Sequence, residues 1–139
     1  MQTTPSVAHL LDRVTAWAAS QPTIAGLALV GSYARGEARA DSDIDLVLLC
    51  TQPPAYVCDT AWIQCFGEVE RCDVEDWGLV RSLRVHYRDG VEVEFGLTTL
   101  AWAQLPVDPG TRSVVAHGLR ILFDRDGRLA RLRDAVAAF

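Results

Sequence analysis

Short apolar runs bounded by glycine, proline or charged residues dominate the hydrophobic pattern of the first half of the chain. The run over 24–30 lies between Pro22 and Gly31, and an unbroken apolar run of this length is typical of a buried strand. A second run begins at Ile44 and continues after Asp45 with apolar residues up to position 49. The two runs predict two buried strands, the first of which ends at the glycine.

Apolar positions at helical spacing mark both ends of the chain. They recur every three or four residues over 7–18, after the helix-start pair Thr4-Pro5, and predict an amphipathic helix that ends near Ser20 and covers a sheet. The same spacing predicts a final helix over 128–139.

The middle of the chain alternates between short helices and strands. The pair Asp89-Gly90 is a turn signal, so the strands before and after it are predicted to form an antiparallel hairpin. This order of elements predicts a single-domain α/β (α+β) fold in which helices pack on a mixed β-sheet. The remaining predicted elements are helices over 56–66 and 99–104, strands over 68–77, 79–88, 91–97 and 119–123, and a loop or mixed segment over 106–115.

Two carboxylates open the second buried strand, shortly after a Gly-Ser pair. Side chains two apart on a strand project to the same face, so Asp43 and Asp45 converge while Ile44 turns into the core. Two carboxylates this close repel each other unless divalent cations neutralise their charge. Their hard oxygen ligands suit Mg²⁺ rather than zinc. At Gly31-Ser32, small residues allow backbone N–H groups and a hydroxyl to approach phosphate oxygens. The spacing indicates metal-dependent nucleotide chemistry.

The segment from Gly31 to Leu46 resembles the nucleotidyltransferases of the DNA polymerase beta superfamily, whose motif joins a Gly-Ser turn, a spaced Asp-x-Asp and a third acidic residue on a neighbouring strand. The resemblance extends over about 27–97 and is greatest to the small bacterial group that contains minimal nucleotidyltransferases and antibiotic adenylyltransferases. It implies a third carboxylate in the strand after the Asp-Gly turn, where Glu92 and Glu94 share one face. We assign this position to Glu94, which lies deeper in the strand, with Glu92 as the alternative.

The resemblance also implies a reaction and its cofactors. A nucleoside monophosphate, AMP from ATP, would pass to an acceptor hydroxyl, and pyrophosphate would leave. Two Mg²⁺ ions would be held by Asp43, Asp45 and Glu94, and Glu94 would also serve as the general base. The expected nucleotide-binding residues are Gly31, Ser32, Arg35 and Ser42. Arg35 would bind the triphosphate, and the alternative is that it is a solvated surface charge.

Composition narrows the function classes. At 139 residues, the chain is predicted to be one nucleotidyltransferase domain over 1–139, with a motif core at about 24–97 and a C-terminal strand and helix at about 111–139. The net charge of −5 disfavours tight binding to nucleic acid, which depends on clustered basic residues. All 13 basic residues are arginine, which excludes a phosphate-binding lysine of the Walker type. Since no apolar run is long enough to cross a bilayer and no signal-peptide pattern is present, we expect a cytoplasmic protein without membrane contact.

The sequence leaves the acceptor open between three alternatives. The first is a small hydroxylated compound, such as an aminoglycoside or lincosamide antibiotic, for which this short chain would need a homodimer to complete the acceptor pocket. The second is a tyrosine of a helical HEPN-type toxin, with the chain as its antitoxin partner. The third is a non-catalytic nucleotide-binding or interaction module that keeps the fold.

No residue in the sequence is an evident reader of the nucleotide base. Aromatic side chains can stack on a base or on an acceptor ring, but they more often serve the core, and we favour packing for those in this chain. The aromatic residues considered are Tyr56, Trp62, Trp77, Tyr87 and Trp102.

Overall fold

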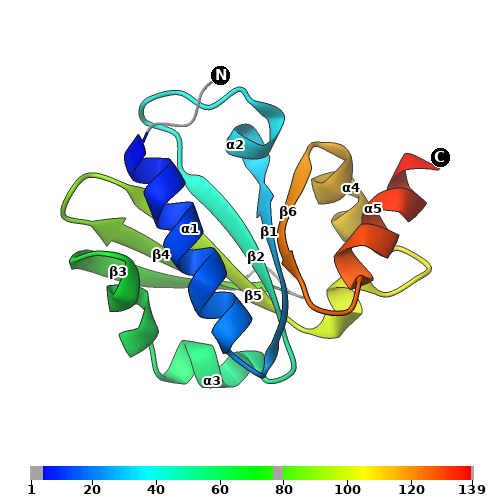
Figure 1. Ribbon diagram of the computed structural model, residues 1–139, viewed down its shortest axis with the longest axis horizontal. Coiled ribbons are helices and arrows are strands. Elements are labelled where there is room, and N and C mark those ends of the chain that lie inside the picture. The colour runs from blue at the N-terminus through cyan, green and yellow to red at the C-terminus, as the bar shows by residue number, and fades with distance from the viewer. Residues whose placement is uncertain (1–4, 77–79, 139) are drawn as a thin grey trace.

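A six-stranded mixed sheet forms the frame of the protein, which the computed structural model describes for residues 5–76 and 80–138 (Figure 1). The strands are β1 (Ile24–Val30), β2 (Ile44–Cys50), β3 (Val69–Asp76), β4 (Val80–Tyr87), β5 (Glu92–Thr98) and β6 (Leu119–Asp124). The α-helices are α1 (Pro5–Ser20), α2 (Gly31–Arg35), α3 (Pro53–Cys58), α4 (Pro109–Ala116) and α5 (Arg128–Ala137), and the 3₁₀ helices are η1 (Ala61–Phe66) and η2 (Leu100–Ala103). None of these helices is long and apolar enough to cross a membrane.

The strand order β3-β4-β5-β2-β1-β6 places β5 and β2, the strands that carry Glu94 and Asp45, in the middle of the sheet. Strand β2 runs parallel to β5, and the other neighbouring pairs are antiparallel. The register pairs Asp45 with Glu94 across β2 and β5, and with Val30 across β2 and β1. The predicted mixed sheet is confirmed, and the parallel pair brings the two acidic segments side by side.

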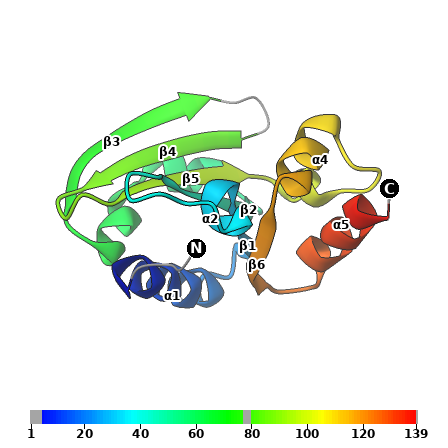
Figure 2. The same ribbon diagram turned by 90° about the horizontal axis from the view of Figure 1, so that it is seen from above.

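Strand alternation divides the core into two layers. One layer lies between the sheet and α1, α3 and η1, and contains the almost fully buried Leu46 and Phe95. The other lies between the sheet and η2, α4 and α5, and contains Val47 and Leu129. Figures 1 and 2 show α1 along one side of the sheet, and α4 and α5 gathered at the β6 end. The second group of helices leaves side chains of β4 and β5, such as Arg84, partly exposed.

Most of the predicted elements are present. The predicted N-terminal helix is α1, the two apolar runs are β1 and β2, and the hairpin at Asp89-Gly90 joins β4 to β5. The short helix before the proline-rich loop is η2, and the C-terminal strand and helix are β6 and α5. The strands predicted over 68–77 and 79–88 each include a position outside the described residues, and one of these positions is Trp77.

The single helix predicted over 56–66 is wrong. Helix α3 begins earlier, at Pro53, because proline lacks an N–H and suits the first helical turn, where the donors have no intrahelical acceptor. It ends before Asp59, whose backbone is extended (φ −117°, ψ 104°), and η1 follows. Trp62 of η1 is half-buried and stacks on Trp17, with ring centroids 4.8 Å apart.

The loop or mixed segment predicted over 106–115 is also wrong in its second part, which is helix α4. The carboxylate of Asp108 accepts hydrogen bonds from the N–H groups of Gly110 (2.9 Å) and Thr111 (3.2 Å), and Pro109 lies in the first turn. A capping aspartate followed by proline is a typical helix start, so the sequence carried this signal.

Candidate active site

Three carboxylates meet on the exposed part of the sheet, where β2 lies beside β5. Asp45 and Glu94 are register partners, and Asp43 immediately precedes β2 on the same side as Asp45. The exposed fraction is 32% for the side chain of Asp43 and 20% for that of Glu94. Glu92, the alternative third carboxylate, lies on the same side and forms a hydrogen bond with Asp43. The structure therefore brings together the three residues predicted to be catalytic, with the alternative residue beside them.

The Gly-Ser segment, expected as a turn, is the first turn of the five-residue helix α2, at the end of β1 (Figure 1). Gly31 has φ +74°, and a Cβ added there would overlap the carboxylate of Asp45. Glycine combines the left-handed backbone with this close approach at little cost, whereas other residues cannot. The glycine therefore allows the start of α2 to pack directly against Asp45.

An arginine of β4 that the sequence analysis did not identify lies among the carboxylates. Arg84 Nη1 donates a hydrogen bond to Asp43 Oδ2 (2.7 Å), and Nη2 donates to Glu94 Oε2 (3.0 Å). Its Nε donates to Glu75 Oε1 of β3 (2.7 Å), and Glu92 Oε2 lies 3.8 Å from Nη1. The guanidinium supplies a positive charge that holds together Asp43 and the acidic side chains of two strands, β3 and β5.

Burial and repulsion between carboxylates change the proton affinity of the site. The pKa of Asp45 is raised from 3.8 to about 7, first by burial and then by the charges of Glu94 and Asp43. Burial also opposes ionisation of Asp43, but hydrogen bonds with Glu92 and Arg84 outweigh it and lower the pKa of Asp43. The hydrogen bond with Asp43 is in turn the main cause of the raised pKa of Glu92. The ionised carboxylate of Asp45 therefore lies in surroundings that disfavour its charge.

The donor set fits the Mg²⁺ that the superfamily resemblance implies. Asp43, Asp45 and Glu94 offer carboxylate oxygens, which hard divalent cations prefer, and a cationic group already lies between two of them. In the arrangement of the described residues, no three His, Cys, Asp or Glu side chains are placed to hold a metal ion. The guanidinium of Arg84 lies between Asp43 and Glu94, where a metal ion bound by both would lie. It must therefore move before both carboxylates can coordinate one cation.

A pocket of about 320 Å³, here called the α2 pocket, adjoins the carboxylates. Arg35 borders it, with Nε donating to Glu37 (3.3 Å) and Nη1 donating to the carbonyl oxygen of His117 (3.4 Å). The side chain of Arg35 is 35% exposed, so its guanidinium is accessible to an anion such as phosphate. The lining residues are Val30, Gly31, Arg35, Asp45, Ser113, Val114 and His117.

Two of the predicted nucleotide contacts do not line the α2 pocket. Ser32 lies in the first turn of α2, next to Gly31, but is not among the lining residues. The Ser42 hydroxyl accepts a hydrogen bond from the N–H of Arg39 (2.7 Å), which holds the turn before Asp43. The structure thus brings Gly31 and Arg35 to the pocket and does not bring the two serines there.

Comparison with known proteins gives one family and two similar structures. The streptomycin adenylyltransferase family matches residues 5–137 of the chain. The fold is similar to that of an aminoglycoside 6-adenyltransferase from Bacillus subtilis, with a TM-score of 0.54 and 14% identity over 73% of this chain and 37% of that chain. A nucleotidyltransferase-like protein from Exiguobacterium sibiricum 255-15 has a TM-score of 0.48 and 17% identity over 94% of this chain and 38% of that chain. The chain therefore spans well under two thirds of either protein, and no curated protein matches its sequence.

Proposed function

The chain belongs to the streptomycin adenylyltransferase family, and from this premise we propose that it transfers AMP from ATP to a hydroxyl group of a small-molecule acceptor. One observation carries the proposal: Asp45, which is paired with Glu94 and lies beside Asp43, borders a pocket that is also lined by Gly31 and Arg35. Nucleotidyl transfer needs both the carboxylates and the pocket, because the triphosphate must be held as an anion while its α-phosphorus is exposed to attack.

In the proposed reaction, the acceptor oxygen attacks the α-phosphorus of ATP. A new O–P bond forms as the bond to pyrophosphate breaks, and the acceptor proton passes to a carboxylate oxygen of Glu94. Arg35 and the backbone at Gly31 would hold the triphosphate in the α2 pocket. Glu94 suits the role of base because its side chain is 20% exposed and because it is the register partner of Asp45 on the neighbouring strand.

The carboxylates of Asp43, Asp45 and Glu94 would together hold two Mg²⁺ ions. The bound cations would lower the pKa of the acceptor hydroxyl and offset the charge of the triphosphate. The raised pKa of Asp45 supports this, because surroundings that disfavour a bare carboxylate favour the same carboxylate with a cation beside it. Arg84 would keep Asp43 and Glu94 together until the cation and the nucleotide arrive.

The surroundings of Glu94 favour an acceptor that carries amino groups as well as hydroxyls. Asp73 and Glu75 of β3 lie on the same side of the sheet as Arg84, and Glu92 adds a further carboxylate. Protonated amines would form charge-assisted hydrogen bonds with such oxygens. We expect a second copy of the chain or a further polypeptide to complete the acceptor site. A tyrosine of a toxin stays a prediction, because no contact described above favours a protein acceptor.

A transfer assay tests the proposed function. The protein is incubated with Mg²⁺, labelled ATP and a panel of aminoglycosides and other hydroxylated amines, and both the mass of the acceptor and the release of pyrophosphate are followed. The wild type is expected to add AMP to at least one acceptor, and Asp43→Ala, with its fold checked by circular dichroism, is expected to add none. A folded Asp43→Ala variant that still transfers AMP would refute the assigned site. Failure of the wild type to bind any nucleoside triphosphate would favour the non-catalytic alternative.

A further inference from the structure

Directly beside the carboxylates, the sheet carries a row of small side chains. Two residues beyond Asp45 and Glu94, the register partners on β2 and β5 are Val47 and Gly96. On the other side of β5, Gly96 pairs with Ser82 of β4. A Cβ at Gly96 would lie 3.0 Å from Val80 Cγ1 and 3.2 Å from the carbonyl oxygen of Leu46. The absence of a side chain at Gly96 therefore leaves a depression in this row.

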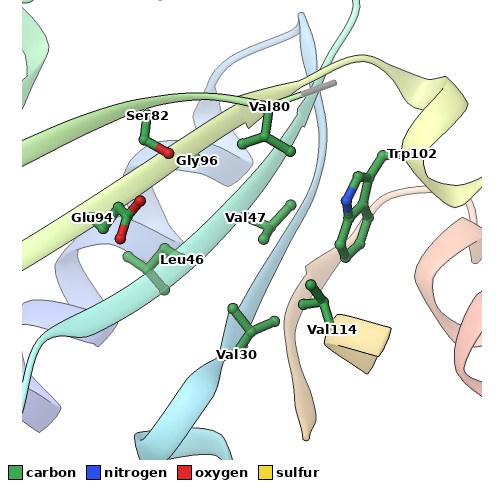
Figure 3. A pocket seen from close by; sticks show the side chains of 9 residues that line it. All are labelled: Val30, Leu46, Val47, Val80, Ser82, Glu94, Gly96, Trp102 and Val114. Carbon is green, nitrogen blue, oxygen red and sulfur yellow. The ribbon is translucent and has the colours of Figure 1, made fainter. Parts of the chain in front are cut away.

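The depression is the floor of an apolar pocket of about 230 Å³ (Figure 3). Trp102 of η2 and Val114 of α4 close one side of it, and Val80 lies at its far end in the view of Figure 3. Glu94 lines the pocket as well, so the carboxylate cluster and the apolar pocket share a wall. We call it the tryptophan pocket.

Two residues with polar side-chain groups line this pocket. Ser82 is 2% exposed and carries a hydroxyl, and Trp102 is 4% exposed and carries an indole N–H. Figure 3 shows the Ser82 hydroxyl directed toward Gly96 and the indole nitrogen on the edge of Trp102 that faces Val47. A hydroxyl and an indole N–H are both hydrogen-bond donors, so both groups can donate to a ligand in the pocket.

The tryptophan pocket adjoins the α2 pocket. Val30 and Val114 line both, so these two side chains form the border that a ligand occupying both pockets would cross. The row of Val47 and Gly96 lies about 7 Å along the strands from the row of Asp45 and Glu94. This separation suits a ribose between an α-phosphate at the carboxylates and a ring in the tryptophan pocket.

Size and polarity distinguish among candidate occupants. Whole drug-sized ligands occupy pockets of about 300–1,000 Å³, so this one holds a single ring system. Valine side chains and an indole suit the apolar faces of a flat heteroaromatic ring, whose edge nitrogens can accept from Ser82 and Trp102. An amino sugar would instead bury ammonium groups against apolar walls, which is unfavourable.

We propose that the tryptophan pocket binds the nucleobase of the nucleoside triphosphate. The inference rests on the proposed function and deepens it, because it assigns the base to a site between β2, β5 and η2. Trp102 then both packs in the second core layer and contacts the ligand. Ser82 and Trp102 become the donors that read the edge of the base.

Two variants and two probes test the assignment. Val80→Trp fills the tryptophan pocket from a residue that does not line the α2 pocket, and Ser82→Ala removes one donor. Val74→Trp adds the same bulk at an exposed position of β3 and serves as the control. Calorimetry with Mg²⁺ present compares ATP, which carries a base, with inorganic tripolyphosphate, which does not.

The expected result is a selective loss of ATP binding. Val80→Trp weakens ATP binding roughly ten-fold or more and Ser82→Ala about five-fold, while tripolyphosphate binds all variants as it binds the wild type. Should Val80→Trp not fold, Ser82→Ala and the amide NMR shifts of Gly96, expected to move with ATP and not with tripolyphosphate, carry the test. Wild-type ATP affinity in both variants, or no ATP-specific shift at Gly96, would overturn the assignment while leaving the proposed function intact. A wild type that binds neither probe would instead overturn the proposed function.

Discussion

The two sides of β2 differ in what their side chains contribute. Ile44 and Leu46 point into the layer under α1 and are 1% and 2% exposed, whereas Asp43 and Asp45, on the other side, belong to the carboxylate cluster. Burial of the first pair stabilises the fold, while the second pair carries charges that repel each other. Since consecutive residues of a strand alternate between sides, stability and chemistry should be separable by changing neighbours in the chain.

The largest effect on activity is expected from Asp45→Asn. The amide keeps the shape of the side chain and removes its charge, so AMP transfer should fall by about 1,000-fold as the cation loses a ligand. The unfolding free energy of the metal-free protein at pH 8 should rise, because the unfavourable charge is gone. Single-turnover transfer and urea unfolding measure the two effects, with Asp12→Asn, at an exposed position of α1 away from the site, as control. Transfer within ten-fold of the wild type would remove Asp45 from the site.

The opposite result is expected one residue further along the strand. Leu46→Ala leaves a cavity in the first core layer and should lower the unfolding free energy by about 2–5 kcal/mol. The affinity of the folded fraction for Mg²⁺ and ATP should stay near that of the wild type. Urea unfolding followed by calorimetry below the transition measures both. A loss of nucleotide binding without a loss of stability would contradict the separation of the two sides.

A smaller effect is expected from Arg84→Gln, which removes the cation from among the carboxylates. Mg²⁺ affinity should increase about ten-fold, because the metal no longer competes with the guanidinium, and the unfolding free energy without Mg²⁺ should fall. Arg81→Gln, an exposed arginine of the same strand, controls for the change in net charge. Weaker Mg²⁺ binding in Arg84→Gln alone would show that the arginine orients the carboxylates for the metal rather than competing with it.

The smallest effect is a pH dependence of stability in the metal-free protein. Because folding raises the pKa of Asp45 from 3.8 to about 7, the folded state favours the neutral carboxyl. Its contribution to stability is complete below pH 3.8 and is lost as the pH rises through about 7. Between pH 5 and pH 8 the unfolding free energy in EDTA should therefore fall more in the wild type than in Asp45→Asn. Parallel pH profiles of the two proteins would contradict this origin of the effect.

The sequence alone predicted the side on which each carboxylate lies, because alternation is a local property of a strand. It grouped Asp43 with Asp45 and Glu92 with Glu94 in this way. The parallel pairing of β2 with β5, which places Glu94 opposite Asp45, joins segments about fifty residues apart and is not encoded in either local pattern. That part of the site came from the family resemblance and is visible only in the folded chain.

Counting from the predicted turn would have missed Arg84 by one residue. A two-residue turn at Asp89-Gly90 pairs Arg84 with Phe95, whereas the loop in the structure is one residue longer, so that Tyr87 pairs with Val91 and Arg84 lies opposite Glu94. The second role of Trp102 could not have been found in this way. The residue packs in the core, as predicted, and its contact with a pocket depends on where η2 docks on the sheet.

The account depends most on the claim that the carboxylate cluster binds a cation together with a nucleotide. Calorimetric titration of ATP into the wild type and into Asp43→Ala, each with and without Mg²⁺, tests this claim most directly. The account predicts ATP binding that requires Mg²⁺ in the wild type and is lost in the folded variant. Binding of equal strength without Mg²⁺, or in Asp43→Ala, would contradict it and would leave Arg84 as the permanent counter-charge of a cluster that takes no metal.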